Sequence, residues 1–127
     1  PSPFDCILTG TMFGNFLSDE APEISGGLGL AGSTMAGDDA CCAQAQHGSA
    51  PDIQGQDKAN PTSLILSAAI LFEGLGARHQ RPELERAAKR IEDAIDAALQ
   101  SADTRTPDLQ GKLGTKAFGR HIAGLVG

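Results

Sequence analysis

A polar, turn-rich stretch leads straight into the longest apolar run of the chain, and this pairing most constrains the fold. Residues 47–60 read HGSAPDIQGQDKAN, and Pro61 opens the apolar run. Glycine, proline and asparagine at this density favour a loop over helix or strand. Asn60 is a good N-cap and Pro61 a good first residue, so a helix is expected from Pro61 to about Gly74, buried on several sides. The small residues of the loop let a ligand approach the backbone, so the segment can cradle a nucleotide.

The rest of the chain alternates strand-like and helix-like patterns, which predicts an α/β layer fold of short strands with about four helices. The other expected elements are a strand at Phe4–Thr9, a helix at Met12–Ile24, a glycine-rich strand at Gly26–Gly32, a loop at Thr34–Asp39, a strand at Cys41–Gln46, helices at about Pro82–Gln100 and Thr115–Val126, and a connector at residues 101–114. Pro22 lacks a backbone donor and should kink or end the first of these helices. The last helix should turn Phe118, Ile122 and Leu125 inward.

Composition excludes several classes of protein. The net charge is −6 and the pI about 4.8, so a nucleic-acid or anionic-membrane partner is not expected. No apolar stretch is long enough to cross a bilayer, and no signal-peptide pattern is present. The odd count of three cysteines, Cys6, Cys41 and Cys42, without a CxxC spacing predicts reduced thiols in a cytoplasmic protein, the adjacent pair being buried. A chain that starts at Pro1 with strand-like residues suggests a fragment, a cleaved product or an excised domain.

Four segments resemble the isocitrate/isopropylmalate dehydrogenase family, in the family's order and over almost the whole chain. They are TGTMFGNFLSDE, SGGLGLAGS, the loop and helix HGSAPDI…ANPTSLILSAAILFE, and RTPDLQGKLGTKAF. Members are metal-dependent, NAD(P)-linked decarboxylating dehydrogenases of 2-hydroxy acids, and the match covers only their C-terminal part. The resemblance implies that residues 1–25 belong to the dimerisation and metal-site domain, and residues 26–127 to part of the nucleotide-binding domain.

The resemblance places the adenosine half of the dinucleotide in the central loop. The implied contacts are His47, Gly48, Ser49, Ala50, Pro51, Asp52, Ile53 and Asn60. Ile53 can pack on the adenine, and Asp52 can accept hydrogen bonds from the ribose hydroxyls while repelling a 2′-phosphate. NADP-preferring members have a Lys-Tyr pair there, and this chain contains no tyrosine, so NAD is the expected cofactor. Taken singly, His47 is an ordinary loop histidine, Asn60 a helix cap and Asp52 a turn residue.

Asn15 and Asp19 lie four residues apart and share a helix face. The resemblance implies a Mg2+ or Mn2+ site on this face, where the family has two aspartates and the metal also binds the substrate. Hard cations prefer charged oxygen ligands, and the amide of Asn15 lacks that charge. Without the resemblance, the two are simply polar residues on a helix surface.

Three functions remain open on the sequence. The first is the C-terminal part of an NAD-dependent decarboxylating dehydrogenase acting on an isocitrate-, isopropylmalate- or tartrate-like acid. The second is a non-catalytic nucleotide-binding or structural module with a decayed metal site. The third is an interaction protein that pairs with a complementary N-terminal half or forms a homodimer. The family's substrate-gripping arginines, its catalytic Tyr and Lys, and a third metal aspartate cannot be mapped onto this chain. The isolated chain is therefore expected to show no dehydrogenase activity.

Overall fold

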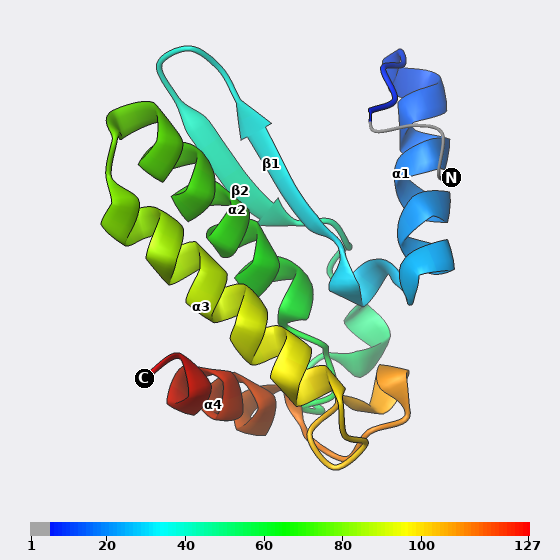
Figure 1. Ribbon diagram of the computed structural model, residues 1–127. Coiled ribbons are helices and arrows are strands. Elements are labelled where there is room, and N and C mark those ends of the chain that lie inside the picture. Colours follow the sequence, from blue (N-terminus) through cyan, green and yellow to red (C-terminus); the bar gives the residue numbers. More distant parts are fainter. Residues whose placement is uncertain (1–5) are drawn as a thin grey trace.

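The computed structural model describes residues 6–127, arranged as a layered α/β unit with one helix standing apart (Figure 1). Its main elements are α1 (Thr11–Ser25), β1 (Gly32–Ala36), β2 (Cys41–Ala45), α2 (Thr62–His79), α3 (Pro82–Leu99) and α4 (Thr115–Val126), with single 3-10 turns η1 (Leu28–Leu30), η2 (Pro51–Ile53) and η3 (Pro107–Leu109). β1 and β2 form an antiparallel hairpin that packs on one side of α2, while α3 packs on α2 and α4 on α3. The predicted α/β class, with short strands and four helices, is confirmed.

Each helix starts within one residue of its predicted start, because caps and prolines mark helix starts. The last helix spans Thr115–Val126 as expected, and the preceding one ends at Leu99, one residue early. The central helix is longer than predicted, since Gly74 lies inside it and it continues to His79. It also begins at Thr62, one residue later than predicted, although Asn60 Oδ1 accepts from the Thr62 amide as a cap would (3.0 Å).

The N-terminal third departs more from the expectations. Part of the predicted strand Phe4–Thr9 lies outside the described residues, and residues 6–9 have no regular structure. Pro22 does not end its helix, which continues to Ser25 before Gly26. The expected strand at Gly26–Gly32 is the 3-10 turn η1, and β1 occupies the beginning of the expected loop Thr34–Asp39. The prediction that this glycine-rich segment passes close to another part of the chain is confirmed at Gly32. A β-carbon there would lie 2.8 Å from Ile70 Cδ1 of α2.

The core lies between α3 and α4. Its fully or nearly buried residues are Ala94, Ile95, Ala98, Phe118 and Ile122, with Ile65, Leu66, Ile91, Leu99, Leu113 and Val126 packed around them. The prediction for Leu125 was wrong, because its side chain is 47% exposed. Burial of these apolar side chains supplies the main driving force for docking the last helix.

Serines rather than large apolar residues form the buried face of α2 against the hairpin. Ser63 and Ser67 are fully buried, whereas Leu64 is 55% exposed, so burial on several sides was only partly right. Ser67 Oγ accepts from the Ser33 amide (2.9 Å) and lies 2.7 Å from both the Gln44 and the Ser63 carbonyls, which share its single proton. Ser63 Oγ donates to the Ala31 carbonyl (2.5 Å) and accepts from the Gln46 amide (3.0 Å). These hydroxyls fix both strands to the helix.

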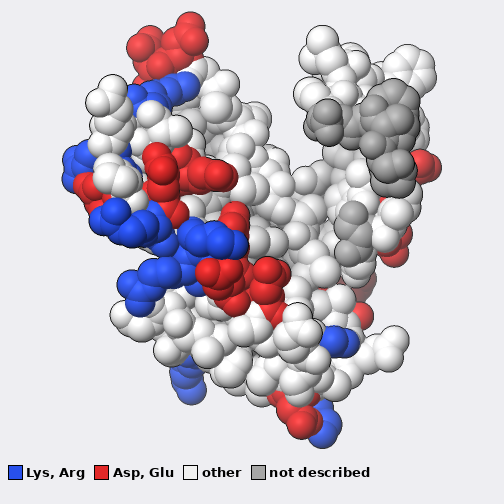
Figure 2. Space-filling model, viewed as in Figure 1, with Lys and Arg blue, Asp and Glu red and all other residues white. Residues whose placement is uncertain are grey.

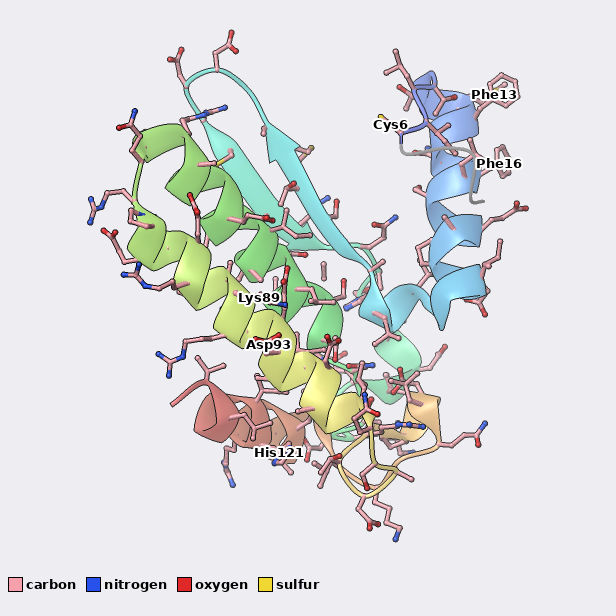
Figure 3. All side chains as sticks on the ribbon, in the orientation of Figure 1. Cys6, Phe13, Phe16, Lys89, Asp93 and His121 are labelled. Carbon is pink, nitrogen blue, oxygen red and sulfur yellow. The ribbon has the colours of Figure 1, made fainter. Side chains whose placement is uncertain are left out.

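α1 carries an apolar stripe that nothing in the described chain covers. Phe13 is 62% and Phe16 66% exposed, and both lie on the side of α1 turned away from the hairpin (Figure 3). Figure 2 shows an open notch between α1 and the rest of the molecule, with charged side chains gathered over α3 on the opposite side. Among the described elements, α1 packs only against η1.

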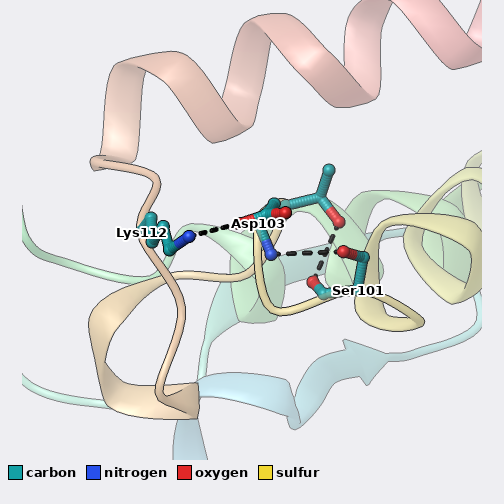
Figure 4. Close-up of polar contacts among 4 residues, drawn as sticks. Ser101, Asp103 and Lys112 are labelled. Atoms are coloured by element: carbon teal, nitrogen blue, oxygen red, sulfur yellow. Dashed lines mark hydrogen bonds and ion pairs between the residues drawn. The ribbon is translucent and has the colours of Figure 1, made fainter.

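The connector between α3 and α4 is held by its own polar contacts (Figure 4). The Asp103 amide donates to Ser101 Oγ (3.2 Å), and Lys112 Nζ lies 2.6 Å from Asp103 Oδ1. Arg105 Nε donates to the Leu99 carbonyl at the end of α3 (2.6 Å). The predicted connector is confirmed, with η3 inside it. None of the helices in the described part of the chain has the length and hydropathy needed to cross a membrane.

Candidate functional site

A large cavity lies in the loop that the sequence singled out. It has a volume of about 650 Å³. Six of the eight predicted contact residues line it, namely His47, Gly48, Ser49, Ala50, Ile53 and Asn60. The other lining residues are Gly29, Gln54, Gly55, Asp57, Lys58, Ala59, Asp108, Thr115 and Lys116. The size is within the range of small-molecule and cofactor sites.

Pro51 and Asp52 do not line the cavity, although they belong to the same loop. Both are exposed and form η2 with Ile53. Ala50, the residue before η2, has a φ of 43°, a left-handed conformation that reverses the chain direction. η2 therefore presents Ile53 to the cavity while the Asp52 carboxylate lies outside its lining. Asp52 can reach only a group that projects beyond the cavity wall.

Asn60 joins the cavity to two other parts of the chain. Its Nδ2 donates to Asp108 Oδ2 (2.9 Å), while its Oδ1 caps α2. A β-carbon at Gly29 would lie 3.2 Å from both atoms of the Asn60–Asp108 bond, so a larger residue at Gly29 would press on it. Asn60 therefore retains one amide hydrogen and one lone pair of its side-chain oxygen for a ligand.

The His47 ring lies beside a backbone carbonyl. Its Nδ1 is 2.9 Å from the Gly48 carbonyl, which can only accept, so this hydrogen bond requires the tautomer with a proton on Nδ1. In that tautomer Nε2 is an acceptor. An acceptor at this position suits an exocyclic amino group, such as that of adenine.

The N-terminus of α4 clamps the loop from the other side. The Thr115 amide donates to the Asp57 carbonyl and the Lys116 amide to Asp57 Oδ1, each at 3.0 Å. Thr115 Oγ1 donates to the Ala59 carbonyl (2.5 Å). A β-carbon at Gly114 would lie 2.4 Å from Asp57 Oδ2, so only glycine allows this approach. Asp57 was not among the predicted site residues, and its only signal in the sequence was its place in the turn-rich loop.

The candidate metal residues lie on α1, away from this cavity. Asn15 and Asp19 are both exposed. The described residues contain no group of three His, Cys, Asp or Glu side chains that could hold a metal ion. A single carboxylate beside an amide does not meet the preference of Mg2+ or Mn2+ for several charged oxygens, so the described residues do not fit a metal ion.

The cysteines also differ from expectation. They are free thiols, as predicted, but Cys42 on β2 is exposed and Cys41 half-buried, so the predicted burial of this pair was wrong. Successive strand residues face opposite sides, which exposes one of any adjacent pair on a sheet covered on one face.

Comparison with known proteins agrees with the order and spacing of these segments. The sequence model described as isocitrate/isopropylmalate dehydrogenase matches residues 1–122. The chain belongs to the isocitrate/isopropylmalate dehydrogenase family. An isocitrate/homoisocitrate dehydrogenase of Thermus thermophilus is 47% identical over 118 residues, covering 93% of this chain and 33% of the relative. A homoisocitrate dehydrogenase of Methanocaldococcus jannaschii is 44% identical, covering 99% of this chain and 34% of the relative.

Solved structures of family members have the same arrangement. Isocitrate dehydrogenase from Methylococcus capsulatus matches with a TM-score of 0.87 and 38% identity, over 99% of this chain and 36% of that protein. A beta-decarboxylating dehydrogenase from Thermococcus kodakarensis matches with a TM-score of 0.76 and 35% identity, over 91% of this chain and 32% of that protein. The chain therefore spans about a third of the length of these family members, and its fold is part of the isocitrate dehydrogenase fold.

Proposed function

We propose that this chain is the C-terminal, nucleotide-binding part of an NAD-dependent decarboxylating dehydrogenase of 2-hydroxy acids. The supporting observation is the cavity, where His47, Ile53 and Asn60 meet residues from the connector and from α4. Substrates of the isocitrate, isopropylmalate or tartrate type are proposed from the family. Bound NAD would supply the hydride acceptor. Residues 1–25 would belong to the dimerisation and metal-site domain, and residues 26–127 to the nucleotide-binding domain.

The chain's own residues would hold the adenosine half of NAD. Nε2 of His47 would accept from the adenine amino group, and Ile53 would cover an adenine face. Gly48 and Ser49 would let the backbone approach the ligand. Asp52 would disfavour a 2′-phosphate from outside the cavity, so NAD is preferred over NADP. The described residues do not fit a metal ion.

Partner association is proposed on the exposed stripe of α1. Apolar patches of this kind mark protein–protein contacts, and the chain spans about a third of its relatives. A homodimer or a complementary N-terminal half would cover the stripe. The isolated chain is expected to show no turnover of any 2-hydroxy acid in a spectrophotometric assay of NAD reduction.

Binding of NAD by the isolated chain tests the proposal. Calorimetric titration should give saturable, sub-millimolar binding of NAD and weaker binding of NADP. Ile53→Glu should weaken NAD binding roughly tenfold or more, because it removes apolar contact and adds a negative charge near the ligand. Leu125→Glu is the control and should bind NAD as the parent does. It also places a charge on a partly exposed apolar position, but at the end of α4 that does not line the cavity. Equal affinity of the parent and Ile53→Glu would reject the cavity as the site.

A second candidate is a non-catalytic nucleotide-binding module of the same fold. Asn15 favours it, because an amide beside Asp19 leaves only one carboxylate on that face. Under this alternative, NAD affinity is the same with and without Mn2+, and Asn15→Asp makes Mn2+ binding measurable by electron paramagnetic resonance. Tight Mn2+ binding by the unaltered chain would exclude it.

A further inference from the structure

Gln46 connects α1 to the hairpin and to α2 through hydrogen bonds. It follows β2 and precedes His47, the first residue of the cavity loop. Its Nε2 donates to the Ser18 carbonyl of α1 (2.8 Å), and its backbone amide donates to Ser63 Oγ of α2 (3.0 Å). A carbonyl accepts only, so the amide nitrogen must face Ser18. One residue thus ties α1, β2 and α2 together.

The hydrogen bond from Gln46 matters because α1 has few other contacts with the rest of the described chain. α1 continues into Gly26 and Gly27, whose φ angles are 128° and 124°, in a region that side-chain-bearing residues rarely adopt. Among the described elements, α1 packs only against η1. Glycine pairs let a helix swing, so the two glycines by themselves leave the direction of α1 weakly fixed.

Ser63 accepts a hydrogen bond from Gln46 next to the last residue pair of the hairpin. Gly32 and Ala45 are the last register pair of the hairpin, so Ala31 and Gln46 come next. The Ser63 hydroxyl accepts from Gln46 and donates to Ala31 (2.5 Å), linking the chain that leaves α1 to the chain that enters the cavity loop. Because Ser63 is fully buried in α2, Gln46 is held by a rigid partner while its side chain reaches α1.

A small cavity lies where these elements meet. Its volume is about 360 Å³, and its lining includes Ser18, Gln46, Ala31, Gly27 and Pro22. Its lining combines residues of α1 with the chain at the open end of the hairpin, and Figure 2 shows a notch between α1 and the rest of the molecule. The Gln46–Ser18 hydrogen bond joins the two sides of this notch, so α1 cannot swing away without breaking it.

We propose that Gln46 is a positioning residue that sets the orientation of α1 relative to the cavity loop. The two bonded residues are next to candidate site residues, since Ser18 precedes Asp19 and Gln46 precedes His47. The hydrogen bond fixes the direction of α1, the helix that bears the exposed Asn15 and Asp19, relative to the loop. The effect on the loop as a nucleotide site rests on the proposed function, whereas the orientation of α1 does not.

The test compares Gln46→Met with Gln44→Met in the full chain. Both replace a glutamine by an unbranched side chain of similar length, but the exposed Gln44 side chain is two residues from the tie. Residual dipolar couplings of backbone amides report helix orientation. In Gln46→Met, the α1 couplings should shrink or change relative to α2 and α3, while Gln44→Met should match the parent. Unchanged α1 couplings in Gln46→Met would overturn the proposal.

A second variant separates orientation from folding. Gln46→Asn keeps the amide but is one methylene shorter, so its nitrogen falls short of Ser18; it should alter the α1 couplings as Gln46→Met does. Gln46→Lys restores a donor of sufficient reach and should return the couplings towards the parent. Failure of Gln46→Lys to do so would show that the donated hydrogen bond is not what orients α1.

The effect of Gln46 on the cavity loop is tested by measuring NAD binding to the same variants. If the parent binds NAD, Gln46→Met should weaken binding by about fivefold, the effect of one lost hydrogen bond, and Gln44→Met should not. Equal NAD affinity of the parent and Gln46→Met would overturn the link to the loop. If the parent does not bind NAD, the proposed function fails, and the dipolar couplings alone decide whether Gln46 orients α1.

Discussion

α1 and α4 are both amphipathic helices of this chain, yet only one has its apolar face covered. Phe118 of α4 is fully buried against α3, whereas Phe16 of α1 is 66% exposed. Both helices show apolar residues at helical spacing, and that spacing carries no information about what lies opposite. The comparison teaches that a helix can form from its local pattern while its tertiary contacts depend on chain elsewhere, or on a partner.

The largest expected difference in stability comes from removing one phenylalanine side chain from each helix. Phe118→Ala should lower the free energy of unfolding by about 3–5 kcal/mol, because it leaves a cavity in the core. Phe16→Ala should change it by less than about 0.5 kcal/mol, because solvent already covers that side chain. Urea unfolding followed by circular dichroism measures both. Similar losses in the two variants would show that α1 is packed in solution.

A smaller effect is expected from the serines. Ser67→Ala removes a buried hydroxyl that bridges Ser33 and Gln44, and should cost about 2 kcal/mol of unfolding free energy. Ser18→Ala removes an exposed hydroxyl that bonds only to the Asn15 carbonyl, and should leave stability unchanged or slightly raised. Denaturant unfolding measures the free energy of unfolding of both variants. If Ser67→Ala were as stable as the parent, the hairpin would not depend on α2 for its polar contacts.

The apolar stripe itself should drive self-association. The double variant Phe13→Gln, Phe16→Gln should lower the association constant of the isolated chain by about tenfold, since apolar area leaves the contact. A matched Phe13→Leu, Phe16→Leu variant keeps most of that area and should associate as the parent does. Sedimentation velocity over a range of concentrations compares them. If the parent is monomeric throughout, the stripe is not a self-association surface.

The smallest expected effect concerns the start of α3. Backbone hydrogen bonding at the helix N-terminus, followed by Arg81, lowers the pKa of Glu83 below its usual value. A lowered folded-state pKa means that this stabilisation is present above the ordinary glutamate pKa and is lost as pH falls through the lowered value. Glu83→Gln should therefore be slightly less stable than the parent at neutral pH and equal to it in acid. Thermal unfolding at both pH values measures the difference, which solvent screening of the exposed carboxylate keeps small.

The sequence predicted those parts of the molecule in which local chemistry decides the structure. Thr115 after glycine, Pro82 at a helix start and the turn residues of the 47–60 loop each act within a few positions. Six of the contact residues predicted in this loop line the cavity. These predictions hold because their causes lie next to them in the chain.

Other features depended on contacts that no local pattern encodes. Gly26–Gly32 offered little side-chain pattern, so η1 was mistaken for a strand. The roles of Ser63 and Gln46 arise only when α2 meets the hairpin, and Asp57 caps a helix that begins fifty-eight residues later, at Thr115. Long-range polar contacts of this kind leave no periodic signal in the sequence.

The most direct test of the central claim is a nuclear magnetic resonance titration of the isotopically labelled chain with NAD. The account predicts saturable shifts of backbone amides in residues 47–60, at Asp108 and at the start of α4, with α3 unaffected. The same residues should respond to ADP-ribose, which carries the adenosine half. An absence of shifts in this loop at millimolar NAD, or shifts confined to other parts of the chain, would contradict the assignment of the cavity to a nucleotide.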